Sequence, residues 1–209
     1  MARRKASLTQ EDKARTRAAI VAAAHDQVAE GGYASASVVI VAGRAGVATG
    51  SVYRYFPSKE ELFAEVFRRA ASAELDLITA IATEAGRPAR ERLAAAVETF
   101  ARRALAAPTL VYALMAEPVD PAVEKERLTS KRAYRTVFAR LLREGVEAQE
   151  LAPLDADVTA AALVGGMQEA LVAPPGTGHE ALVASLVQFS LNAIATEGAR
   201  HGDSAPQAV

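Results

Sequence analysis

One stretch, residues 37–59, constrains the fold of this chain more than any other, because its pattern is that of two short helices joined by a tight turn. Apolar residues recur at helical spacing from Val38 to Ala45, and Gly46 then breaks the run. A second short helix is expected from about residue 48. It must end before Pro57, because proline disrupts a helix from inside.

The residue types in this stretch fit two helices that cross at a steep angle. Ala42 is small enough for the point of closest approach, and Gly46 tolerates the positive φ that the turn needs. Val41, Val47 and Val52 would fill the wedge between the helices. A small residue, a glycine four positions later and a valine six positions after that is the spacing of a DNA-binding helix-turn-helix.

The outward face of the second helix is suited to duplex DNA. Thr49, Gly50 and Ser51 are short, so they can lie nearest the bases. The two tyrosines, Lys59 and the start of the first helix would hold phosphates, and Arg44 could contact either bases or phosphates. The predicted DNA-binding residues are Ser37, Arg44, Thr49, Gly50, Ser51, Tyr53, Arg54, Tyr55 and Lys59. The alternative is a helical hairpin of any α-helical protein, with Tyr53 and Tyr55 as half-buried packing residues.

These residues carry a family resemblance. The segment 45–62, AGVATGSVYRYFPSKEEL, resembles the tetracycline-repressor (TetR) family of one-component bacterial regulators. Residues 20–33, IVAAAHDQVAEGGY, are similar to that family's first helix. The resemblance covers about residues 13–67, a third of the chain, and it implies DNA binding.

The chain departs from the family pattern at a few positions. Ala48 stands where the family usually has a capping serine or threonine, which leaves Thr49 as the candidate cap. Val39 and Ile40 replace residues that are usually polar, and Ile40 argues against phosphate contacts by that helix. Gln27 and the valine after it replace a larger apolar pair, so thinner packing is expected beneath the motif.

Composition narrows the class of protein. Half of the 209 residues are apolar and only 5% are aromatic, which favours helices packed closely through small side chains. The absence of cysteine excludes disulfides, thiolate metal sites and cysteine nucleophiles, and fits a cytoplasmic protein. No apolar run approaches the length of about 18 residues of a membrane span, and no signal peptide is expected.

Charge is unevenly distributed along the chain. Residues 1–59 hold nine Lys and Arg against four Asp and Glu, and the remainder holds fifteen against twenty-one. A basic module that meets a polyanion, followed by an acidic body that does not, accounts for this asymmetry. A slightly acidic α-helical domain with a basic tail is the alternative.

We predict an all-α fold with short connections and about nine helices, because no strand pattern and no internal repeat appears. Beyond the helix-turn-helix, the expected helices cover residues 10–30, 58–83, 89–106, 108–115, 121–148, 155–173 and 179–197. The predicted division is an N-terminal three-helix DNA-binding domain at 1–57 with a basic arm at 1–10, a connecting helix at 58–84, a C-terminal α-helical ligand-binding and dimerisation domain at 85–200, and a flexible tail at 201–209.

The last two helices carry signs of close packing. Two consecutive glycines lie inside the helix at 155–173, and each costs about 1 kcal/mol against alanine, so close approach of another backbone is the natural reason. The helix that follows is apolar on more than one face. The resemblance implies a two-fold dimer through Ala162, Gly165, Gly166, Leu182, Leu186 and Phe189. A kink or a tight monomer core is the alternative.

The C-terminal half contains few large side chains. The resemblance implies an effector pocket lined by Phe100, Tyr112, Met115, Tyr134, Phe138 and Met167. Plain core packing is the competing interpretation for each of them. Gln168 and Glu169 are polar groups near that region that could simply face solvent. No metal site or cofactor is expected.

The sequence therefore predicts a homodimeric transcriptional regulator, a repressor, that binds a palindromic operator in double-stranded DNA and is released by an unidentified small-molecule effector. Ligand-driven tilting of the helix at 58–84 would change the spacing of the two reading heads. Two alternatives are a helical interaction protein that has lost DNA binding, and an enzyme. The enzyme finds little support, because His25, His179 and His201 are scattered and no catalytic pairing appears.

Overall fold

The computed structural model describes residues 9–174, 176 and 178–195, and this part of the chain is all-α. The predicted arm residues Arg3, Arg4 and Lys5 and the tail at 201–209 lie outside the described residues. No helix in the described part is long and apolar enough to cross a membrane. Its helices are α1 (Gln10–Gly31), α2 (Val38–Arg44), α3 (Thr49–Tyr55), α4 (Lys59–Ala82), α5 (Ala89–Ala106), α6 (Pro108–Met115), α7 (Pro121–Glu147), α8 (Ala156–Val172) and α9 (His179–Ala193).

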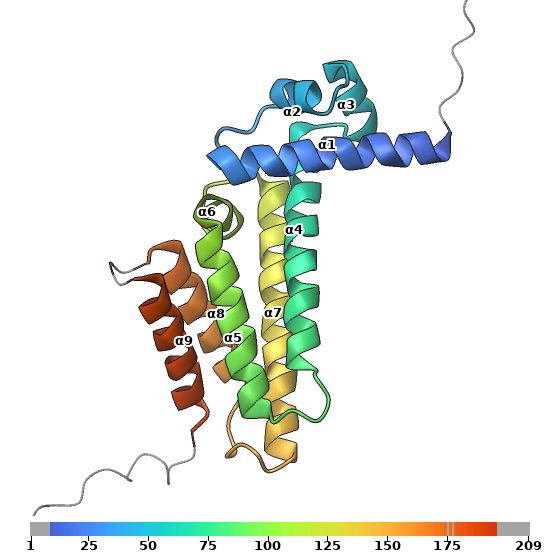
Figure 1. The fold of residues 1–209 in the computed structure, drawn as a ribbon. Helices are drawn as coiled ribbons and strands as arrows, with labels where there is room; N and C mark the ends of the chain where they lie inside the picture. The colour runs from blue at the N-terminus through green and yellow to red at the C-terminus, as the bar shows by residue number, and fades with distance from the viewer. Residues whose placement is uncertain (1–8, 175, 177, 196–209) are drawn as a thin grey trace, which may run out of the picture.

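The helices form a small upper unit and a larger body. Figure 1 shows α1 lying across one end of the paired helices α4 and α7, with α2 and α3 on the far side of α1. Helices α5, α8 and α9 complete the body, and the short α6 lies beneath α1. Helix α3 is therefore remote from the body, at one end of the molecule.

Helix α4 belongs to both units. Its first turns bury Leu62, Phe63 and Phe67 in the core formed with α1, α2 and α3. Its last turns bury Ile78 and Ala82 in the core of the body. One rigid helix thus connects the two hydrophobic cores.

A buried carboxylate ties α1 to this connecting helix. Glu65 of α4 is 6% exposed and accepts a hydrogen bond from Arg17 of α1 at 2.8 Å and from Arg69 at 2.7 Å. The guanidinium of Arg17 also lies 4.8 Å from the centre of the Phe56 ring. A buried carboxylate needs such partners, because an unpaired charge away from water is costly.

The helix ends agree with the sequence predictions to within two residues, except at the C-terminus. Ser58 caps α4 by accepting from the amide of Glu61 at 3.2 Å, as its position predicted. Helix α9 ends at Ala193 rather than at 197, and the residues from 196 onward lie outside the described part. At α3, the N-cap position is Ala48 and no side chain caps it, so the expected capping by Thr49 is wrong.

Gln27 has a role that the sequence did not suggest. Its side chain is buried, donates to the carbonyl of Ser35 at 2.9 Å and accepts from the amide of Ser37 at 3.2 Å. These two bonds satisfy buried backbone groups of the loop between α1 and α2. Gln27 thus binds the loop that enters the helix-turn-helix on both sides, and the expectation of thinner packing stays a prediction.

Candidate nucleic-acid interface and ligand cavity

The turn between α2 and α3 has the geometry that its sequence predicted. Gly46 adopts φ of 67°, a region that residues with a Cβ rarely occupy. The amide of Val47 donates to the carbonyl of Ala42 at 3.0 Å, and Ala42 is 2% exposed at the crossing of the two helices. Val41 and Val52 are buried between them.

Helix α3 presents its first turn and one side to solvent. Gly50 is exposed, and a Cβ built there would meet nothing within 4 Å, so another molecule can approach the backbone closely. Thr49 and Ser51 flank it and are half-buried. Tyr53 is 47% exposed and Arg54 is also exposed. Tyr55 packs partly on the core, so less of its side chain can reach DNA than the prediction assumed.

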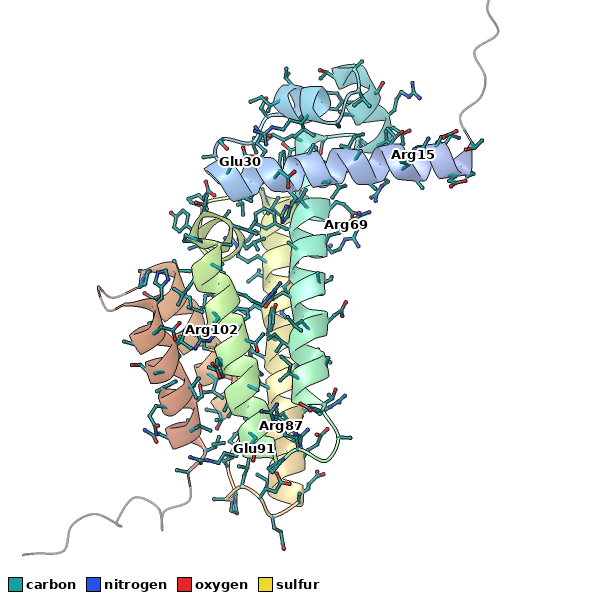
Figure 2. The ribbon with its side chains drawn as sticks, in the orientation of Figure 1. Arg15, Glu30, Arg69, Arg87, Glu91 and Arg102 are labelled. Atoms are coloured by element: carbon teal, nitrogen blue, oxygen red, sulfur yellow. The ribbon has the colours of Figure 1, made fainter. Side chains whose placement is uncertain are left out.

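Arg44 is engaged within the chain. Its guanidinium donates to both carboxylate oxygens of Glu30, at 3.0 Å and 2.7 Å, which holds the pKa of that carboxyl below its usual range. Figure 2 labels Glu30 at the end of α1, beneath α2. A DNA contact by Arg44 would compete with this ion pair.

Two other predicted phosphate contacts lie at the edges of the motif. The ammonium of Lys59 lies 5.2 Å from the centre of the Tyr33 ring, and the residue is half-buried. Ser37 precedes α2 but its side chain makes no capping bond. Val39 and Ile40 are 67% and 47% exposed, so the neighbouring surface of α2 is apolar.

The body contains a cavity of about 620 Å³, within the range of small-molecule sites. Side chains from α4, α5, α6, α7 and α8 form its mostly apolar walls, and His25 of α1 reaches its edge. Five of the predicted pocket residues line it: Phe100, Met115, Tyr134, Phe138 and Met167.

The prediction for Tyr112 is corrected. Helix α6 turns Leu110, Val111 and Leu114 toward the cavity, which leaves Tyr112 on the opposite side, where it is 46% exposed. Gln168 lines the cavity and donates to the carbonyl of Met115 at 3.0 Å.

The cavity also has charged residues that sequence reasoning missed. Glu74 accepts a hydrogen bond from Nε of Arg103 at 2.7 Å, and Arg127 donates to backbone carbonyls at the end of α6. Burial, and then the charge of Glu74, raise the pKa of Tyr134 above its ordinary value. The available signal was that Glu74 lies on the same face of its helix as Phe67 and Ile78. No group of His, Asp or Glu in the described part could hold a metal ion.

The comparisons with known proteins agree with both halves of this architecture. The family model for bacterial regulatory proteins of the tetR family matches residues 20–66, and that for the tetracyclin repressor-like C-terminal domain matches residues 86–171. The chain belongs to the TetR family. It is therefore a transcriptional regulator with a DNA-binding helix-turn-helix. A comparison with curated proteins returned no match.

Solved structures of other regulators resemble this one. The TetR/AcrR-family regulator from Thermobifida fusca is 29% identical, with a TM-score of 0.66 over 84% of this chain and 96% of that one. The fatty acid degradation regulator FadR from Bacillus halodurans is 25% identical, with a TM-score of 0.71 over 84% and 94%. FadR from Bacillus subtilis, in complex with stearoyl-CoA, is 22% identical, with a TM-score of 0.71 over 85% of this chain and 99% of that one. At this identity the likeness supports the shared fold alone.

The predicted dimer residues of this TetR-family chain fall into two groups. Leu182 and Leu186 are 5% and 6% exposed because α9 packs them against the body, chiefly α5, so they offer little area to a second subunit. Phe189 is 49% exposed, and a Cβ at Gly165 would meet nothing within 4 Å. Ala162 and Phe189 are exposed, and Gly165 and Gly166 are half-buried, with the Phe189 ring beside Gly166; these residues lie on α8 and α9.

Proposed function

We propose that this TetR-family regulator is a homodimeric cytoplasmic repressor that binds a palindromic operator and is released by a small-molecule effector. The observation that carries the proposal is the placement of α3 beyond α1, with Gly50 open in its first turn. A helix so placed can enter the major groove without interference from the body.

The DNA contacts divide by the part of the duplex that each residue meets. Thr49, Gly50 and Ser51 lie nearest the bases, and the side chains around them contact phosphates. The phosphate contacts are Ser37, Tyr53, Arg54, Tyr55 and Lys59, with Arg44 joining when its ion pair with Glu30 opens. The DNA-binding domain is residues 1–57, the connecting helix 58–84 and the ligand-binding and dimerisation domain 85–200.

The dimer forms through the open face of α8 and α9. Gly165 permits close approach of a second backbone, and Phe189 supplies apolar area beside it. A two-fold axis through this face gives two copies of α3, which read half-sites about 34 Å apart.

The effector occupies the cavity of the body. That cavity is bounded by the middle of α4 and, through His25, by α1, so a ligand can bias the placement of the DNA-binding unit. The stearoyl-CoA complex of Bacillus subtilis FadR motivates a ligand with a large apolar part, which also suits these walls.

The test combines operator selection with salt dependence. Purified protein would select fragments from its own genome, and the affinity for the selected duplex would be measured by fluorescence anisotropy over a range of salt. Arg54→Ala and Lys59→Ala should each reduce the slope of log K against log salt by about 1. Arg135→Ala, an exposed change on α7, is the matched control and should leave the slope unchanged. A shallow slope that neither variant alters would overturn the proposal.

A second candidate function is a helical interaction protein. The exposed side chains of Val39 and Ile40 favour it, because they replace polar surface on the motif with apolar surface. The same titration separates the two, since binding to a protein through apolar side chains lacks the steep salt dependence of phosphate contacts.

A further inference from the structure

Glu74 is the polar side chain of the cavity with an unmet hydrogen bond. One oxygen, Oε2, accepts from Arg103, while Oε1 is buried and has no partner in the described part of the chain. A buried carboxylate oxygen without a donor is unfavourable, because it has lost its hydrogen bonds to water and gained none in return. The terminal torsion of a glutamate is broad, so a small rotation can present Oε1 to the cavity that Glu74 lines.

The positive groups of the cavity are not equivalent partners for a ligand. Arg103 is bound to Glu74, and Arg127 is bound to Glu124 and to three backbone carbonyls. Lys131 is exposed, so its charge is hydrated. An anionic ligand therefore finds no buried and unpaired cation among the described lining residues, whereas a donor finds a buried and unpaired acceptor.

Aromatic rings lie at the same end of the cavity. Phe100 and Tyr134 pack edge to face with their centres 5.5 Å apart, and both line the cavity with Glu74. Burial, and then the charge of Glu74, raise the pKa of Tyr134, which is the effect expected of a carboxylate that lines the same cavity. Aromatic faces beside a carboxylate favour a cation over a neutral donor.

We infer that the ligand of this cavity is an apolar molecule bearing a protonated amine, and that Glu74 accepts a hydrogen bond from its ammonium group while Phe100 and Tyr134 flank the charge. The inference deepens the proposed function and rests on it for the regulatory meaning of the site. The binding chemistry itself concerns only the cavity.

The experiment compares three probes with the same apolar chain: decylamine, decan-1-ol and decanoate. Each would be titrated into the full-length protein by calorimetry, below its micelle-forming concentration. Decylamine should bind at least about tenfold more tightly than decanoate, because its ammonium donates to the Glu74 carboxylate, whereas decanoate has no donor and carries a like charge. Decan-1-ol should fall between them.

The variants assign the preference to one carboxylate. Glu74→Gln should abolish the advantage of the amine, while Glu98→Gln should retain it, because Glu98 is an exposed partner of Arg102 outside the cavity lining. Phe100→Leu should reduce the advantage several-fold through loss of the ring, and it provides a second test should Glu74→Gln fail to fold. Circular dichroism verifies folding of each variant.

Several outcomes would overturn the inference. They are equal or tighter binding of decanoate, survival of the amine preference in Glu74→Gln, and failure of all three probes to bind. None of these affects operator binding, which is measured without ligand. Conversely, a chain that binds no DNA but prefers decylamine through Glu74 would refute the proposed function and leave the cavity chemistry intact.

Discussion

The carboxylate of Glu117 accepts a hydrogen bond from the backbone amide of Tyr33 at 2.6 Å, across 84 positions of sequence. It accepts a second from the amide of Ala34 at 2.8 Å. Glu117 follows α6, and Tyr33 follows α1, so the connection between α6 and α7 holds the end of α1. Arg127, which lines the cavity, donates to the carbonyl of Glu117 at 2.8 Å. A continuous set of bonds therefore joins the cavity to the entry of the helix-turn-helix.

Glu117→Gln should destabilise this junction. The glutamine has one acceptor oxygen, and its amide would face a backbone N–H, so the amide of either Tyr33 or Ala34 loses its partner. We expect the free energy of unfolding to fall by about 1–3 kcal/mol, measured by urea denaturation. Glu169→Gln, an exposed change on α8, should leave it unchanged. An unfolding curve of Glu117→Gln that coincides with that of the wild type would contradict this assignment.

Glu30→Gln should release Arg44 for DNA. The neutral glutamine cannot form the doubly bonded ion pair seen here, so the guanidinium no longer has to leave a carboxylate to reach a phosphate. Operator affinity at low salt should rise several-fold and the salt slope should steepen.

The control is Glu61→Gln, which removes the same charge from an exposed position in the first turn of α4. It reports the general effect of lowering the negative charge near DNA. Equal effects of the two changes would show that Arg44 does not take part in binding.

Alkaline pH should destabilise the protein through Tyr134. Burial raises the pKa of this phenol above its ordinary value of 10.0, so above that pH the unfolded chain loses a proton that the native state keeps. The contribution of the protonated Tyr134 phenol to the free energy of unfolding is fully present below pH 10 and is lost as the pH rises further. Tyr134→Phe should therefore show a smaller fall in melting temperature between about pH 9 and 11 than the wild type.

The exposed Tyr53 provides the comparison for that measurement. Tyr53→Phe removes one phenol from the surface and should follow the wild-type profile. If Tyr134→Phe followed it too, burial of Tyr134 would not contribute to the alkaline loss.

The helix-turn-helix was predictable because its determinants are local. Ala42, Gly46 and Val52 lie within eleven residues, and each is constrained by the turn that they form together. The helix boundaries follow equally from nearby prolines, glycines and the capping Ser58. These signals require no knowledge of which helices are neighbours.

The remaining features depend on contacts between distant segments. Tyr112 and Leu182 are both large side chains on helices, yet one is exposed and the other buried, according to which helix each faces. The bond between Glu117 and Tyr33 joins two loops that the sequence separates, and the pattern around either residue gives no sign of it. The large side chains singled out in the sequence include five that line the cavity, but the pairing of its charges could not be predicted.

Gly165→Ala tests whether a second subunit packs against α8, because the added methyl group should affect the isolated chain and the dimer in opposite directions. A Cβ at this position meets nothing within 4 Å, so in the isolated chain alanine should only favour the helix, by about 1 kcal/mol. If a second subunit approaches the backbone here, the same methyl group must weaken self-association. We expect the dimer dissociation constant to rise about tenfold or more in sedimentation equilibrium, while the helix content is retained.

Ser72→Ala on α4 separates the two effects, because it also favours a helix at an exposed position but lies on a helix outside the proposed face. It should leave the dissociation constant as in the wild type. Phe189→Ala should weaken the dimer in the same direction as Gly165→Ala, because it removes exposed apolar area beside the glycines. Unchanged association in both Gly165→Ala and Phe189→Ala would place the dimer contact elsewhere, since neither close approach nor apolar burial would then occur on this face.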